Sequence, residues 1–214
     1  MRLPLLLALF LILAPKQSAT ASALAPTVQA AISANGRVLC YLEVRQHSDN
    51  NGKSYQIDSV TYHILTYSEA PGPHSYIGTL VPSTGGHFWT GFAEDWSITL
   101  TGWDALNWPI VSDDGDTLAL ASYGWPSEDR KLLSVYHRNR GSKPLLVGSY
   151  TLADLWTRDE IASTVGEMVT GAIAPWYASG NFTFSPEGDF VYANPRHYIT
   201  HIDVVTGKLT HNNW

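Results

Sequence analysis

The chain carries one pattern twice, as Val111-Ser112-Asp113-Asp114-Gly115-Asp116 and as Phe184-Ser185-Pro186-Glu187-Gly188-Asp189. Each copy has an apolar residue, a serine and an acidic turn with glycine, and it runs into an alternating segment, 118–121 or 191–194. A tight Asp/Gly turn between two short apolar segments is typical of a β-hairpin. The chain is therefore predicted to be all-β and to contain an internal repeat.

Other segments carry strand and turn patterns as well. Residues 37–45 alternate between apolar and polar side chains, and residues 54–67 are rich in β-branched and aromatic residues. We expect these two segments to pair as a hairpin around the polar loop 47–53. Further strands are expected at 76–81 and 88–89, from Trp96 onward, and on both sides of the turn Thr206-Gly207-Lys208.

One helix interrupts this β pattern. Thr157 and Glu160 have the spacing of a capping box, and Ile161, Val165 and Met168 follow at helical spacing. We expect a short helix over about 153–168.

The length of the repeat is estimated from four serines that lie in or beside turn segments: Ser48, Ser83, Ser112 and Ser185. Their separations are 35, 29 and 73 residues. The first two are near the size of a β-meander, and the last is close to two such units. Coincidental hairpins are the alternative interpretation of this loose spacing.

The stretch Phe184 to Tyr192, followed by Ile202-Asp203-Val204-Val205-Thr206-Gly207-Lys208-Leu209, resembles a blade of the WD40-like and YVTN-type bacterial β-propellers. Residues 111–121 resemble the first half of another blade. The chain also resembles uncharacterised secreted bacterial proteins. This resemblance implies an all-β fold of propeller-like or stacked β-meander sheets with one short inserted helix. The number of blades is left open, since closed propellers use four or more.

The N-terminus predicts export. Arg2 precedes an apolar run over 3–14 and the small residues of 18–23, which is the pattern of a signal peptide ending near residue 23. This run is too short to cross a bilayer, so no membrane span is expected in the mature chain. We expect a flexible N-terminal segment over 24–35 and a single domain over 36–214, secreted or periplasmic. Cys40, the single cysteine, is predicted to be buried on a strand face and has no partner for an internal disulfide.

Charge and motif content bear on partners and cofactors. With 19 acidic against 13 basic residues, nucleic acid is not expected as a partner. Asp113, Asp114 and Asp116 lack the ligand spacing of a calcium-binding EF-hand loop and are interpreted as turn residues. His197 and His201 share a strand face about 13 Å apart, too far to bind one zinc ion. No metal and no cofactor is predicted.

Tryptophan is the least ordinary component of the sequence, which has eight. Five lie between residues 89 and 125, and most are expected in the core. Trp103 and Trp108 bracket a polar loop and are the candidate ligand-binding residues, because exposed indoles stack on sugar faces.

Three functions are compatible with this pattern. The first is a non-catalytic binding or structural module with a protein or glycan partner in the cell envelope. The second is a carbohydrate-recognising protein with a tryptophan-rich surface. The third is a hydrolase of an envelope polymer, since catalytic groups assembled from distant loops leave no local motif. No catalytic residue is assigned.

Overall fold

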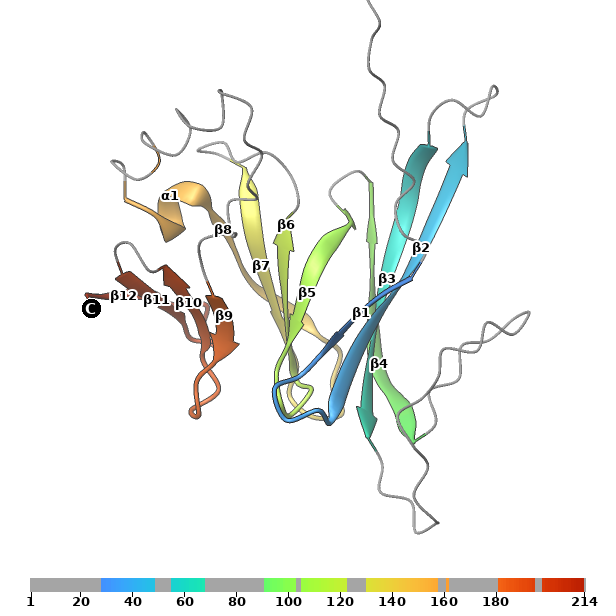
Figure 1. The fold of residues 1–214 in the computed structure, drawn as a ribbon, viewed down its shortest axis with the longest axis horizontal. Coiled ribbons are helices and arrows are strands. Elements are labelled where there is room, and N and C mark those ends of the chain that lie inside the picture. The colour runs from blue at the N-terminus through green and yellow to red at the C-terminus, as the bar shows by residue number, and fades with distance from the viewer. Residues whose placement is uncertain are drawn as a thin grey trace, which may run out of the picture.

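The computed structural model describes residues 28–48, 55–67, 91–102, 105–122, 130–157, 161, 181–194 and 198–213. These residues form twelve strands and one short helix (Figure 1). The elements are β1 Val28–Ile32, β2 Val38–Ser48, β3 Tyr55–Tyr67, β4 Phe92–Thr101, β5 Asn107–Val111, β6 Thr117–Ser122, β7 Lys131–His137, β8 Leu145–Thr151, α1 Leu152–Leu155, β9 Asn181–Phe184, β10 Phe190–Asn194, β11 Tyr198–Ile202 and β12 Leu209–Asn213.

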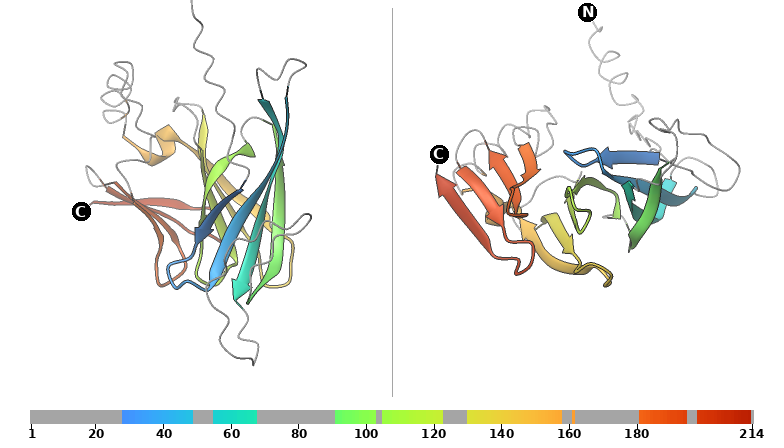
Figure 2. Two further views of the ribbon diagram at one scale, coloured as in Figure 1. Left: turned by 45° about the vertical axis from the view of Figure 1, so that its right-hand side comes forward. Right: turned by 90° about the horizontal axis from the view of Figure 1, so that it is seen from below.

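The strands form three antiparallel sheets of four strands each, and every sheet follows the chain order. The first sheet contains β1 to β4, the middle sheet β5 to β8 and the third sheet β9 to β12. Figure 2 shows the three sheets in this order along an arc when the molecule is seen from below. The all-β prediction is confirmed, and the predicted pairing of 37–45 with 54–67 corresponds to β2 and β3. The expected strands at 76–81 and 88–89 lie outside the described residues.

A repeated turn joins the first two strands of every sheet. Both predicted hairpins are present, and a third copy, Ile32-Ser33-Ala34-Asn35-Gly36-Arg37, connects β1 to β2. In each copy the glycine N–H donates to the serine carbonyl, at 3.0, 3.1 and 2.9 Å in chain order. The three glycines have φ angles of 73°, 78° and 96°, which side chains other than glycine rarely adopt.

The turns correct the predicted length of the repeat. The equivalent serines are Ser33, Ser112 and Ser185, which lie 79 and 73 residues apart. Ser48 is instead the last residue of β2, and Ser83 lies outside the described residues. The repeating unit is thus a whole four-stranded sheet. The first copy escaped detection because Ala34 and Asn35 replace the acidic pair of the middle copy.

One predicted segment boundary was wrong. Residues 28–32 belong to the predicted flexible segment 24–35, yet they form β1, paired with β2 from Val28↔Glu43 to Ile32↔Leu39. The backbone hydrogen bonds to β2 order this alanine-rich strand, which carries little strand signal of its own.

The predicted helix over 153–168 is interrupted. Ile161 is helical again, and its N–H donates to the carbonyl of Thr157 at 3.1 Å, whereas residues 158–160 and 162–168 lie outside the described residues. Helix α1 ends at Leu155, because Trp156 has extended backbone angles of φ −126° and ψ 154°. Its indole is buried and donates to the hydroxyl of Tyr192 at 3.0 Å, so a contact with the third sheet prevails over the helical pattern. Thr151 and Asp154 form the capping box of α1.

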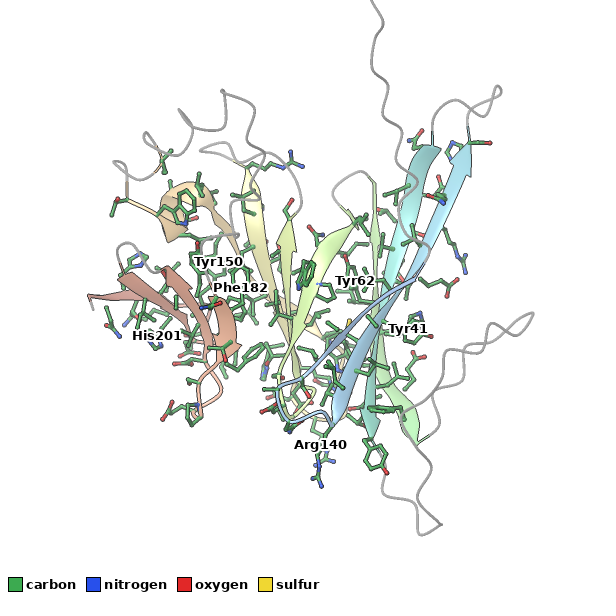
Figure 3. The ribbon with its side chains drawn as sticks, viewed as in Figure 1. Tyr41, Tyr62, Arg140, Tyr150, Phe182 and His201 are labelled. Atoms are coloured by element: carbon green, nitrogen blue, oxygen red, sulfur yellow. The ribbon has the colours of Figure 1, made fainter. Side chains whose placement is uncertain are left out.

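The core consists of two clusters, one on each side of the middle sheet. All six residues of β6 are buried. Leu118 and Leu120 face the first sheet, whereas Ala119 and Ala121 face the third. Figure 3 shows Tyr62 on the first side and Tyr150 with Phe182 on the second. A strand buried on both faces has no polar alternation, which explains its continuous apolar sequence.

Hydrogen bonds link the first and middle sheets at their turn end. The indole of Trp96 donates to the carbonyl of Gly115 at 2.7 Å. Arg138 is 4% exposed, and its side chain donates to the carboxylates of Asp116 and Asp95. Cys40 is fully buried between these sheets, as predicted. None of the described helices is long and apolar enough to traverse a bilayer.

Candidate functional site

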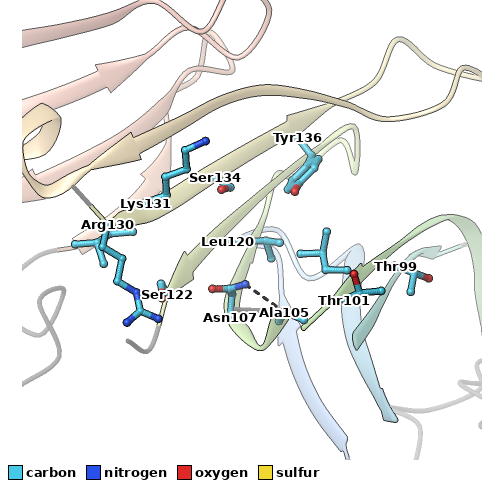
Figure 4. A pocket seen from close by; sticks show the side chains of 12 residues that line it. Thr99, Thr101, Ala105, Asn107, Leu120, Ser122, Arg130, Lys131, Ser134 and Tyr136 are labelled. Carbon is cyan, nitrogen blue, oxygen red and sulfur yellow. Dashed lines mark hydrogen bonds between the residues drawn. The ribbon is translucent and has the colours of Figure 1, made fainter. Parts of the chain in front are cut away.

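A cleft of about 670 Å³ lies between the first and middle sheets (Figure 4). Its volume is within the range of about 300–1,000 Å³ that is usual for small-molecule sites. Twelve residues line it: Thr99, Leu100, Thr101, Ala105, Asn107, Leu120, Ser122, Arg130, Lys131, Leu132, Ser134 and Tyr136.

Four strands bring these side chains together. One wall is the edge strand β4, which contributes residues 99–101. The opposite wall is the middle sheet, where β7 presents Ser134 and Tyr136. Successive residues of a strand point to opposite faces, so Leu133 and Val135 belong to the core shared with the third sheet. Leu132 borders the cleft and also belongs to that core.

Tyr62 fixes the segment that joins the two walls. Its hydroxyl donates to the carbonyl of Ala105 at 2.7 Å and accepts from the N–H of Asn107 at 2.7 Å. The side chain of Asn107 also donates to the Ala105 carbonyl at 3.3 Å, the dashed line in Figure 4. Because Tyr62 is fully buried in the first sheet, the shape of the cleft depends on the packing of the two sheets.

Two β-bulges interrupt the pairing of β7 with β8 beside the cleft. The register shifts between Lys131 and Leu133, where Leu132 is the extra residue, and again between Val135 and Tyr136. Bulges change the direction of neighbouring side chains and are frequent beside binding sites. The strand that supplies most of the polar lining is therefore also the irregular one.

The lining is polar and positively charged. It holds the two cations Arg130 and Lys131, five hydroxyl side chains and one carboxamide, and no carboxylate is among the described lining residues. Burial raises the pKa of Tyr136 above its ordinary value, so its hydroxyl remains protonated and able to donate at neutral pH. Such a site can hold an anionic group and several hydroxyl groups at once.

Neither predicted tryptophan is among the described residues that line this site. Trp103 lies outside the described residues. Trp108 is 50% exposed on β5, but it does not line the cleft, because it follows Asn107 and the two side chains point to opposite faces of the strand. Trp96 and Trp156 are buried in the two core clusters.

Sequence reasoning missed the residues of the cleft. They come from four separate strands, which leaves no local motif. One signal was present: Arg130 and Lys131 are the only two adjacent basic residues in the chain.

The acidic residues of the middle turn are engaged with protein donors. Asp113 accepts from the N–H of Asn35 at 2.8 Å, Asp114 accepts from the N–H of Asp116 at 2.9 Å, and Asp116 accepts from Arg138 at 3.0 Å. Across the described part of the chain, no group of three metal-ligating side chains is suitably placed to hold an ion. His201 is half-buried on β11, and His197 lies outside the described residues.

A second group of titratable side chains lies on the outer face of the first sheet. His63 stacks on Tyr41 with ring centroids 4.4 Å apart, and Glu94 lies 3.2 Å from its Nδ1 atom. Glu43 lies 3.7 Å from the other ring nitrogen. The two carboxylates thus flank one imidazole from opposite sides.

Comparison with family models, with curated proteins and with solved structures finds no match to this chain.

Proposed function

We propose that this protein is an exported, non-catalytic binding module that takes a small, hydroxyl-rich ligand in the cleft between its first two sheets. The single observation that carries the proposal is the cleft itself, with its hydroxyl and carboxamide side chains above an apolar floor of Leu120 and Leu132. Sites for small polar ligands combine apolar walls with a few placed hydrogen-bonding groups.

The scaffold is proposed to be of the propeller type. Three antiparallel four-stranded meanders in chain order support this, as does the turn that recurs at the start of each sheet. Blades of this kind are rigid and present ligand sites between sheets and on loops. The fold alone does not determine the ligand, because one fold hosts many activities.

Binding is favoured over hydrolysis by the lining of the cleft. Glycoside hydrolases generally use two carboxyl groups that flank the scissile bond. The described lining contains none, and Asp113 and Asp116, in the turn at the opposite end of β5 and β6, are bound by Asn35 and Arg138.

A second candidate is glycan binding at the surface around Trp108. Its support is the 50% exposure of a large indole on a rigid strand. This site is separate from the cleft, so substitutions distinguish the two candidates.

The test is calorimetric titration of the folded protein with a panel of neutral and acidic mono- and disaccharides. Ser134→Trp places an indole in the cleft from the side of β7 that faces the first sheet and is expected to abolish binding. Ser97→Trp, at an exposed position on the outer face of β4 outside the cleft, is the control and should bind as the wild type does. Binding that survives Ser134→Trp but is lost in Trp108→Ala would transfer the function to the Trp108 surface.

A further inference from the structure

We infer that the ligand of the cleft is an acidic sugar, whose carboxylate or phosphate lies against Arg130 and Lys131. This inference rests on the proposed function of the same cleft. It adds the chemical class of the ligand and the orientation of the ligand in the cleft.

The charge of the lining departs from that of the whole protein. The chain has 19 acidic and 13 basic residues. The described lining nevertheless has two cations and no carboxylate. On a protein with a net charge of −6, Arg130 and Lys131 are the described lining side chains that can attract an anionic group to the cleft.

The two cations lie together at one end of the cleft. They are consecutive residues at the start of β7, and Figure 4 shows them on the side opposite Thr99 and Thr101. The bulge at Leu132 follows directly and sets the direction in which Lys131 leaves the strand. Arginine supplies a planar fork of donors and lysine a compact charge, and both bind carboxylates and phosphates.

The remaining polar side chains extend from this end along the cleft. Ser122 and Asn107 lie beside the cations, and Ser134 and Tyr136 continue along β7 towards β4 (Figure 4). Hydroxyl and carboxamide groups both donate and accept hydrogen bonds, as do the hydroxyl groups of a sugar. A ligand with one anionic group followed by several hydroxyl groups matches this order, whereas an isolated anion uses only one end.

The experiment titrates wild-type protein and two variants with four probes: digalacturonate, a hexose phosphate, a neutral disaccharide and inorganic phosphate. Lys131→Gln removes one charge from the cleft and is expected to lower the affinity for the acidic sugars by about tenfold. This is the effect expected from the loss of one hydrogen bond to a charged group. Lys143→Gln removes an exposed charge from the β7–β8 turn, outside the cleft, and should leave their affinity unchanged. Affinity for the acidic sugars should also fall with added salt.

The possible outcomes separate the two claims. The inference is supported if the acidic sugars bind more tightly than the neutral disaccharide and phosphate, and if only Lys131→Gln lowers their affinity. Tight binding of the neutral disaccharide, unchanged in Lys131→Gln, overturns the inference and leaves the proposed function standing. Phosphate that binds as well as the acidic sugars overturns the sugar assignment. No binding of any probe overturns the proposed function together with the inference.

Discussion

The hydroxyl of Tyr62, on the first sheet, accepts a hydrogen bond of 2.7 Å from the backbone N–H of Asn107, on the middle sheet. The same hydroxyl donates to the carbonyl of Ala105. Both partners line the cleft. One buried side chain therefore holds the two sheets together and sets the position of the site between them.

Removing this hydroxyl should cost stability. Tyr62→Phe leaves a buried N–H and a buried carbonyl without this partner, and we expect the free energy of unfolding to fall by about 1–3 kcal/mol. Urea denaturation followed by tryptophan fluorescence measures the change. Tyr67→Phe, at a tyrosine that is 41% exposed, is the control and should be nearly neutral. Equal stability of the two variants would show that the Tyr62 hydroxyl does not join the sheets.

The three equivalent turn glycines should differ in their tolerance of alanine. All have positive φ, where a side chain other than glycine costs about 1–2 kcal/mol. A Cβ atom at Gly36 or Gly188 would meet nothing within 4 Å, but at Gly115 it would lie 3.2 Å from Thr66 and 3.5 Å from Val38. Gly115→Ala should therefore lower the melting temperature more than Gly36→Ala or Gly188→Ala. An unchanged melting temperature in all three variants would contradict the repeated-turn structure.

Cys40 should be unreactive in the folded protein. It is fully buried, and burial raises the pKa of its thiol, which disfavours the nucleophilic thiolate. A maleimide reagent is expected to label it only in denaturant, or at the rate at which the native protein unfolds. Rapid labelling of the native protein at neutral pH would contradict its position between the sheets.

Asp203 should contribute to acid sensitivity. Its carboxylate accepts hydrogen bonds from the N–H groups of Thr206 and Val205, both at 2.9 Å, and these bonds lower its pKa below the ordinary value. A lowered pKa in the folded state adds stability above the pKa of the unfolded chain, and this stability is lost as the pH falls through the folded pKa.

Asp203→Asn keeps a side-chain oxygen acceptor but does not titrate. Its denaturation midpoint should therefore fall less than that of the wild type between about pH 7 and pH 3, a range that spans the ordinary pKa of aspartate. Parallel decreases in the two proteins would show that the turn does not hold this carboxylate in its charged form.

Strand pairs with strong alternation could be predicted from the sequence, as could turns that carry their own signal. The apolar set of β2 predicted both its hairpin and the burial of Cys40. The Asp/Gly turns predicted two of the three equivalent hairpins. The first copy has Asn35 in place of an acidic residue and is flanked by alanines, so its pattern was too weak to detect.

The cleft could not be predicted from local sequence patterns. Residues 99–101 and 130–136 meet only because the first and middle sheets pack face to face, which depends on Tyr62, Trp96 and Leu118 far from either segment. The predicted helix is interrupted for a related reason, since Trp156 packs against the third sheet. Trp108 was singled out correctly as exposed, but it lies outside the cleft.

The most direct test of the cleft as the binding site is hydrogen exchange of the folded protein with and without digalacturonate. We expect slower exchange confined to residues 99–101, 105–107, 120–122 and 130–136, where the two walls and the basic end of the cleft lie. Slower exchange at Trp108 and in the third sheet, with the segments that line the cleft unchanged, would contradict the cleft as the binding site.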